Sequence, residues 1–191
     1  MRKFFVAFAT LLMCVGLQVS VSAAPRVYSR NVDTCCLLIA TPDLKTEDFM
    51  NAVEDKINPE NQQNAVVGTA VQTKYQEYWL NKGSLEEGKL TKDVMHDFVK
   101  FSGFKKCLFV VPTMQMEKSK VPSGLFMRVE QNRASIEIKG FLVDDSNILK
   151  IINVTQNDDS NHSELRAKRG AFEKGIRDLA SQFITYIKTG K

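Results

Sequence analysis

The sequence predicts an α/β fold with α+β character in its C-terminal half, built as one three-layer domain around a mixed sheet. Two continuous apolar runs, residues 36–42 (CLLIATP) and 107–113 (CLFVVPT), alternate with stretches of helical periodicity, as buried parallel strands do. Residues 134–143 and 148–156 instead alternate apolar and polar side chains, which is typical of an antiparallel hairpin with one covered face. Residues 162–188 have the spacing of one long amphipathic helix.

The first 23 residues read as a cleavable signal peptide. Arg2 and Lys3 precede an apolar run over residues 4–15, and small residues lead to the candidate cleavage positions Ala23 and Ala24. The following proline favours the cut after Ala23. The apolar run is shorter than the roughly 20 residues of a membrane-spanning helix, so we expect cleavage rather than anchoring. A lipid-attachment signal would use the cysteine at position 14, but a bulky methionine stands where such signals place a small residue.

We therefore divide the chain into the signal (1–23), a polar lead-in (24–34) and a single domain (35–191). Two of the 26 basic residues and none of the 22 acidic ones lie in the signal, which leaves a net charge of +2 on the rest. This balance gives no electrostatic reason to expect nucleic acid as a partner. No later segment is long and apolar enough to span a membrane, so after cleavage we expect a periplasmic or extracellular protein.

The N-terminal half predicts strands that alternate with helices. Residues 34–43 form the first strand, and residues 43–58 form a helix with an i, i+4 apolar stripe. Residues 64–72 (NAVVGTAVQ) form a second strand, and residues 73–83 continue as a short helix that ends at Gly83.

A further helix over residues 90–103 leads into the third strand, residues 105–115. Thr91 is suited to cap the start of this helix, and Val94, Phe98 and Phe101 are expected to face inward.

The C-terminal half predicts a loop at residues 117–124, an edge strand at 125–133, and then the hairpin and final helix described above. The tetrapeptide DDSN occurs twice, at residues 144–147 and 158–161. The first copy suits a hairpin turn and the second suits the cap of the last helix, so alanine at the true cap should cost about 1 kcal/mol. The nine-residue strand expected between the copies, residues 148–156, spans roughly 30 Å, which excludes one shared metal site.

Cysteine and histidine are the residues considered for chemistry. Without the signal, Cys35, Cys36 and Cys107 remain, so at most one disulfide can form, and Cys36 with Cys107 is the candidate pair. The alternative is that all three are small buried residues of strands. A nucleophilic pair of Cys107 or Cys36 with His96 is conceivable, but it needs a thiol that is exposed in a cleft.

No metal site or cofactor is predicted. His96 and His162 have no partner at metal-ligand spacing, and the chain lacks a CxxC pair, a phosphate-binding loop and a dinucleotide fingerprint. Tyr75, Tyr78 and Trp79 lie at i, i+3 and i+4 on one helical face. They are either ordinary core or, if exposed, a patch for a protein partner.

The order of elements resembles the CsgG-like and TolB amino-terminal α/β domains of bacterial envelope proteins. The matching features are the opening strand (CCLLIATP), the helix–glycine–strand step FSGFKKCLFVV, the hairpin SIEIKGFLVDDSNILKI and the closing amphipathic helix, over about residues 35–188. This chain departs from the family at Val111-Pro112, where a glycine often stands, and it adds no pore-forming or propeller segment.

The resemblance implies a non-catalytic module that binds other envelope proteins, without naming residues for the role. The leading hypothesis is thus an exported binding or assembly module of the bacterial envelope with unidentified envelope partners. A carrier of small ligands or peptides and a hydrolase-type enzyme that uses Cys107 and His96 are the alternatives.

Overall fold

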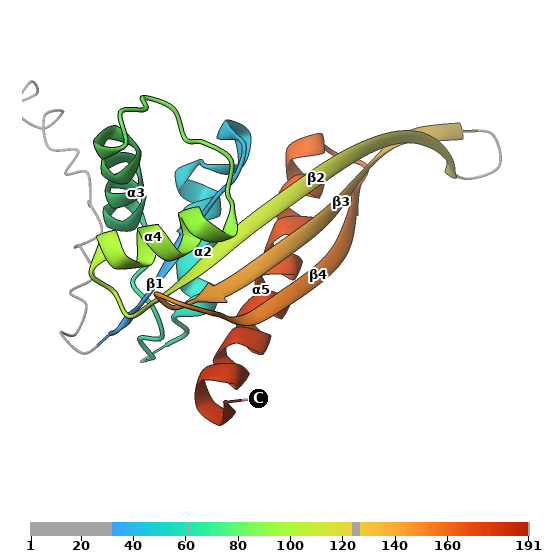
Figure 1. Cartoon of the computed structure of the whole chain (residues 1–191). Coiled ribbons are helices and arrows are strands. Elements are labelled where there is room, and N and C mark those ends of the chain that lie inside the picture. Colours follow the sequence, from blue (N-terminus) through green and yellow to red (C-terminus); the bar gives the residue numbers. More distant parts are fainter. Residues whose placement is uncertain (1–31, 61, 124–126, 191) are drawn as a thin grey trace, which may run out of the picture.

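A computed structural model describes residues 32–60, 62–123 and 127–190. Its centre is a four-stranded sheet in the order β1-β2-β3-β4, formed by Thr34–Leu38, Lys106–Ser123, Met127–Val143 and Ile148–Ser160 (Figure 1). β1 runs parallel to β2, whereas β2 pairs antiparallel with β3 and β3 with β4. The predicted α/β class with a mixed sheet is confirmed. The predicted signal, with Ala23 and Ala24, lies outside the described residues.

Among the described residues, four α-helices and a short 3-10 helix, η1 (Pro42–Leu44), surround this sheet. The α-helices are α2 (Glu47–Ile57), α3 (Thr69–Asn81), α4 (Lys92–Ser102) and α5 (Glu164–Thr189). α2 and α5 pack on one face of the sheet, and α3 and α4 cover the β1 end of the other face (Figure 1). These three layers bury two hydrophobic clusters, one on each side of the strands.

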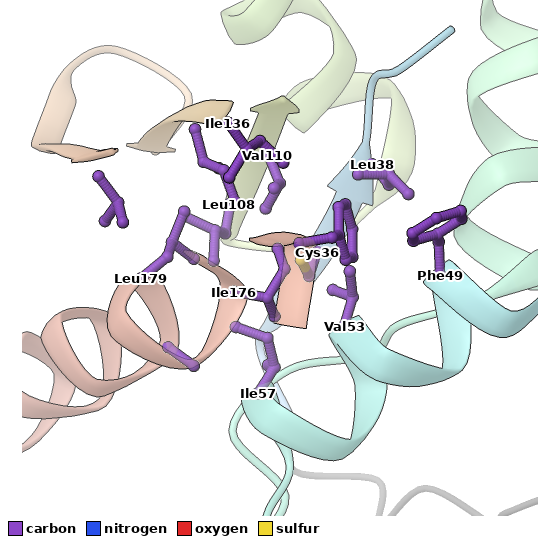
Figure 2. Packing of buried hydrophobic residues seen from close by; sticks show 14 of the residues in the cluster. Cys36, Leu38, Phe49, Val53, Ile57, Leu108, Val110, Ile136, Ile176 and Leu179 are labelled. Carbon is purple, nitrogen blue, oxygen red and sulfur yellow. The ribbon is translucent and has the colours of Figure 1, made fainter. Parts of the chain in front are cut away.

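The larger cluster lies between α2, α5 and the sheet. Alternate residues of β2 and β3, among them Leu108, Val110 and Ile136, lie in one cluster with Phe49 of α2 and Ile176 of α5 (Figure 2). Phe172 of α5 belongs to the same cluster. The rings of Phe49 and Phe172 lie edge to face with their centroids 4.7 Å apart. Because the side chains of a strand alternate between faces, the intervening residues of β2 serve the second cluster under α3 and α4.

The second predicted strand, residues 64–72, is wrong. Only Val66 makes a bridge, to Cys35 of β1, and α3 already begins at Thr69. Gly68 makes the sharp entry into this helix with φ of 99°, a conformation that glycine adopts without strain. Ala65, Val67 and Val71 of this stretch are buried, but they pack from a loop and a first helical turn, which a short apolar run does not distinguish from a strand.

The predicted loop at 117–124 is also wrong, because β2 continues to Ser123 and stays paired with β3. Pro122 near its end has no N–H to donate, and it is tolerated because β2 has no described neighbour on its other side there. Residues 127–133 of the predicted edge strand at 125–133 are the start of β3. β3 pairs only with β2 as far as Gln131, and from Asn132 to Val143 it is an inner strand that also pairs with β4.

Candidate functional site

The three aromatic residues proposed as a partner patch are part of the core instead. Tyr75 and Tyr78 are only 1% and 3% exposed, and Trp79 is half-buried against them. Phe98 of α4 packs edge to face on both tyrosine rings, at 5.1 and 5.8 Å between centroids. Because α4 covers this side of α3, the rings are not available to a partner. Burial also raises the pKa of Tyr75 to about 12.

The connection beyond α3 closes over the same cluster. The ammonium of Lys82 lies 4.8 Å from the centroid of the Tyr78 ring and 2.9 Å from Oδ2 of Asp97 on α4. The Trp79 ring packs so closely on Gly88 that a Cβ there would lie 2.5 Å from a ring carbon. These contacts stabilise the α3–α4 pair rather than form a binding surface.

Cys35, Cys36 and Cys107 are free thiols, and all three are buried. In the register of the parallel strands Cys35 lies beside Cys107, and Cys36 lies beside Leu108. Cys36 therefore faces α2 and α5, whereas Cys107 faces α3 and α4. The predicted Cys36–Cys107 pair lies on opposite faces of the sheet, so the neighbouring pair is Cys35 and Cys107.

The structure does not provide the exposed thiol that a Cys–His nucleophile needs. Cys107 is 0% exposed, and its burial raises the pKa of its thiol well above the ordinary value. His96 lies on α4, and its Nδ1 is 2.9 Å from the carbonyl oxygen of Asp144. A carbonyl can only accept, so this nitrogen carries the proton and donates it. The observed role of His96 is to tie α4 to the turn that follows β3.

The first DDSN forms the predicted hairpin turn between β3 and β4. Oδ1 of Asp144 accepts hydrogen bonds from the backbone N–H groups of Ser146 and Asn147, at 2.8 and 2.6 Å. These two bonds hold the pKa of the Asp144 carboxyl below its usual range. The turn closes with the N–H of Asp144 bonded to the carbonyl of Asn147 at 3.0 Å.

The second DDSN does not cap the last helix. Its residues 158–160 extend β4, and Ser163 is the N-cap, with its Oγ accepting from the N–H of Arg166 at 3.1 Å. Ser160 is buried, and its Oγ accepts from the N–H groups of His162 and Ser163 at 3.2 and 3.3 Å. Asp158 faces α5, where its Oδ1 lies 2.5 Å from Nζ of Lys174.

Surface grooves are shallow among the described residues. A groove of about 160 Å³ lies between α2 and α5, beside the ion pair of Asp48 with Arg169. A second groove, of about 400 Å³, lies between β4 and α5 and is lined by residues 153–156 of β4 and by Asp178, Ser181 and Gln182 of α5. Polar side chains line most of both. In the part of the chain that the structure describes, no three His, Cys, Asp or Glu side chains are grouped to hold a metal ion.

The feature that the sequence interpretation missed is a projecting arm. We define the arm as residues 118–123 of β2 paired with residues 127–132 of β3, because β4 ends opposite Asn132. It extends away from the helices as a two-stranded ribbon (Figure 1). Over residues 113–117 methionine alternates with threonine, glutamine and glutamate, and this alternation continues the predicted third strand toward the arm. That alternation is the signal that could have predicted it.

Side chains of the arm are largely in solvent. Lys118, Ser119, Lys120 and Arg128 are exposed, as is Glu130. Lys118 reaches Oε2 of Glu164 at the start of α5, at 3.3 Å. Three of the four charged residues of the arm are basic.

Comparisons with known proteins add structural likenesses only. No protein-family model matches the chain, and no curated protein matches its sequence. Within the described residues, no helix has the length and apolar character that crossing a bilayer requires.

Several solved structures are similar over most of their length. A minor lipoprotein from Acinetobacter baumannii is 12% identical, with 83% of this chain and 94% of that chain covered and a TM-score of 0.30. Lipoprotein GNA1162 from Neisseria meningitidis is 14% identical, with coverages of 80% and 96% and a TM-score of 0.40. The hypothetical protein CT253 from Chlamydia trachomatis is 9% identical, with coverages of 81% and 94% and a TM-score of 0.42. These TM-scores assign neither a family nor a function to this chain, and the CsgG-like or TolB-like resemblance stays a prediction.

Proposed function

We propose that the protein is an exported binding or assembly module of the bacterial cell envelope, and that the arm is the element that contacts its partner. Export is supported by the signal pattern of residues 1–23, and the envelope by the resemblance described above. The observation that carries the binding role is the arm, a ribbon that projects from the domain without covering its core.

The physical reason concerns the cost of ordering such a ribbon. Fixing the backbone of each residue costs roughly 1–2 kcal/mol of conformational entropy, and an isolated two-stranded hairpin is at best marginally stable in water. The side chains at residues 117–120 are exposed on both faces, so the arm buries little apolar surface in return. A segment that adds so little to the stability of the domain is well suited to gain its stabilising contacts from a partner.

The charges of the arm favour an acidic protein surface as that partner. The arm carries three basic residues, Lys118, Lys120 and Arg128, and one acidic residue, Glu130, which lies opposite Lys120. No ion pair is observed for Lys120 or Arg128 among the described residues, so both are available to carboxylates of a partner. Complementary charge of this kind steers association and makes binding sensitive to salt.

Site-specific photocrosslinking in the native cell tests the proposal. A photoreactive residue at Ser119, in the arm, is expected to form a defined adduct with an envelope protein, and the same residue at Thr185, exposed on α5, is the control. The adduct should disappear with Lys120→Glu combined with Arg128→Glu, and should weaken as salt rises. Equal adducts at Ser119 and Thr185, or none at Ser119, would refute the role of the arm.

A further inference from the structure

We propose that β4 is a self-association edge, through which a second copy of this chain pairs antiparallel and continues the sheet. This inference goes beyond the function proposed above and concerns a different surface from the arm. β4 is the last strand in the sheet order, and no other described strand pairs with its outer side. It lies along the open side of the sheet for its whole length (Figure 1).

The free edge of β2 beyond β1 and the free edge of β4 differ in whether another strand can pair with them. Beyond its pairing with β1, β2 carries Pro112 and Pro122, which donate no hydrogen bond, and Lys118 and Lys120. Prolines and lysines are the residues with which natural edge strands prevent pairing. β4 (ILKIINVTQNDDS) has no proline in its 13 residues and a single lysine, Lys150, near its start. Its row of backbone groups is therefore open to strand addition.

A second copy is the occupant that the charge pattern of β4 fits. The strand is basic near its start, at Lys150, and acidic near its end, at Asp158 and Asp159. An antiparallel copy brings the basic end of one strand to the acidic end of the other. Opposite charges that lie directly across a strand pair are stabilising, and like charges are destabilising.

Strand geometry selects one register for this pair. A two-fold axis perpendicular to the sheet keeps each face on its own side, so residues that lie opposite each other must share a face. Lys150 and Asp158 share the face covered by α5, as their β3 partners Leu142 and Ala134 show. Placing Lys150 opposite Asp158 puts the axis at Val154, which is also the midpoint of the strand from Ile148 to Ser160. The register that matches the charges is thus the one that pairs the whole strand.

The surroundings of the edge leave room for this arrangement. The groove of about 400 Å³ beside residues 153–156 is bounded on α5 by Asp178, Ser181 and Gln182. It lies at the middle of β4, where the axis would pass. Short polar side chains on the α5 flank allow the two helices to approach across the axis without burying an apolar group against a polar one. Lys150 lies over the Tyr186 ring at 5.7 Å, and Asp158 is bonded to Lys174, so contacts with α5 hold both side chains on the same face of the strand.

Sedimentation equilibrium of the chain without its predicted signal peptide measures the association. The concentration range should reach from about 1 to about 200 µM, because an interface formed by one strand pair is small and binds weakly. We expect a monomer–dimer equilibrium. Lys150→Glu and Asp158→Lys should each raise the dimer dissociation constant about tenfold, because each removes two symmetric ion pairs and adds repulsion. An equimolar mixture of these two variants should form the heterodimer with nearly the original affinity. Lys120→Glu, with the same change of charge in the arm, is the matched control and should leave the equilibrium unchanged.

Disulfide crosslinking reads the register without relying on the folding of Asp158→Lys. Asn153 and Thr155 are exposed and lie opposite each other across the proposed axis. Asn153→Cys mixed with Thr155→Cys should therefore form a linked dimer under mild oxidation, while neither variant alone should link. The native thiols are buried and should not take part. A chain that stays monomeric throughout, a dimer without the mixed link, or links in either single variant would overturn the proposal. Failure of photocrosslinking at Ser119 would leave this result untouched, so the two proposals fail separately.

Discussion

Replacing Gly175 with alanine tests how closely α5 packs on the sheet. Gly175 is buried in the middle of α5, and a Cβ added there would lie 2.7 Å from Cδ1 of Ile138 and 3.4 Å from Cγ2 of Ile136. In an exposed helix this substitution would stabilise by about 1 kcal/mol, because alanine loses less conformational entropy than glycine. Here the new methyl group meets two fully enclosed isoleucines.

The size of the effect follows from two opposing contributions. Overpacking a close-packed core typically costs about 1–3 kcal/mol, and the helix propensity returns about 1 kcal/mol. Ile138 is 0% exposed, so its terminal methyl group can move only against the core residues packed around it. We therefore expect Gly175→Ala to lower the free energy of unfolding by about 1 kcal/mol. Urea denaturation followed by far-UV circular dichroism measures this difference.

A double-mutant cycle separates the close contact from other effects. Ile138→Val removes the methyl group that the new Cβ would meet, and by itself it should cost about 0.5–1.5 kcal/mol. Adding Gly175→Ala to Ile138→Val should cost less than it does alone, with a coupling energy of at least about 0.5 kcal/mol. Thr185→Ala, on the exposed side of the same helix, should change stability by no more than about 0.5 kcal/mol. Stabilisation by Gly175→Ala, or strict additivity of the two changes, would refute the packing described here.

Three further predictions concern the cap, the turn and the thiols. In the same denaturation experiment, Ser163→Ala should lower the free energy of unfolding by about 1 kcal/mol, and Asn161→Ala should lower it by less than about 0.5 kcal/mol. A larger loss for Asn161→Ala than for Ser163→Ala would contradict Ser163 as the cap. Asp144→Ala should destabilise near neutral pH. Because the pKa of Asp144 is lower in the folded than in the unfolded protein, its carboxylate stabilises the fold above the unfolded pKa of about 3.9, and this stabilisation is lost as pH falls below that value. The original protein and Asp144→Ala should therefore converge in stability in acid. A stability difference that does not change with pH would contradict an ionic contribution. Maleimide at pH 8 should not label Cys35, Cys36 or Cys107 in the folded protein, but it should label all three in urea. Mass spectrometry measures the labelling. Rapid labelling of Cys107 in the folded protein would contradict its burial.

The strong periodic patterns were sufficient to predict most of the fold. The apolar stripe of residues 43–58, the cap at Thr91 and the alternation over 134–143 correspond to α2, α4 and β3. Each is a local pattern that tertiary packing reinforces. By contrast, residues 64–72 combine β-branched residues with burial, yet they lie at the entry to α3, because core burial satisfies a loop and a helical turn as well as a strand.

The candidate site could not be predicted in the same way. The spacing of Tyr75, Tyr78 and Trp79 fixes a common helical face, but only the position of α4 decides that this face is buried. Likewise, Cys36 and Cys107 both begin apolar runs, and the strand register alone decides that they point to opposite faces. Asp158 and Ser160 have the composition of a cap, but pairing with β3 draws them into β4, and Ser163 takes the capping position. In each case a contact distant in sequence overrides local chemistry.

Not every uncovered surface of this domain needs a partner. Opposite α5, the sheet exposes Thr113, Glu137, Asn153, Thr155 and their neighbours, and antiparallel sheets tolerate such a solvated face because polar side chains alternate with core residues. The arm and the β4 edge are different. The arm is ordered with few apolar contacts of its own, and β4 has no described strand on its outer side. In a monomer, water can hydrogen-bond the outward-facing backbone groups of β4. A paired strand can make these hydrogen bonds while leaving less of the protein surface exposed. For this reason we assign partner contacts to these two elements and not to the polar face between them.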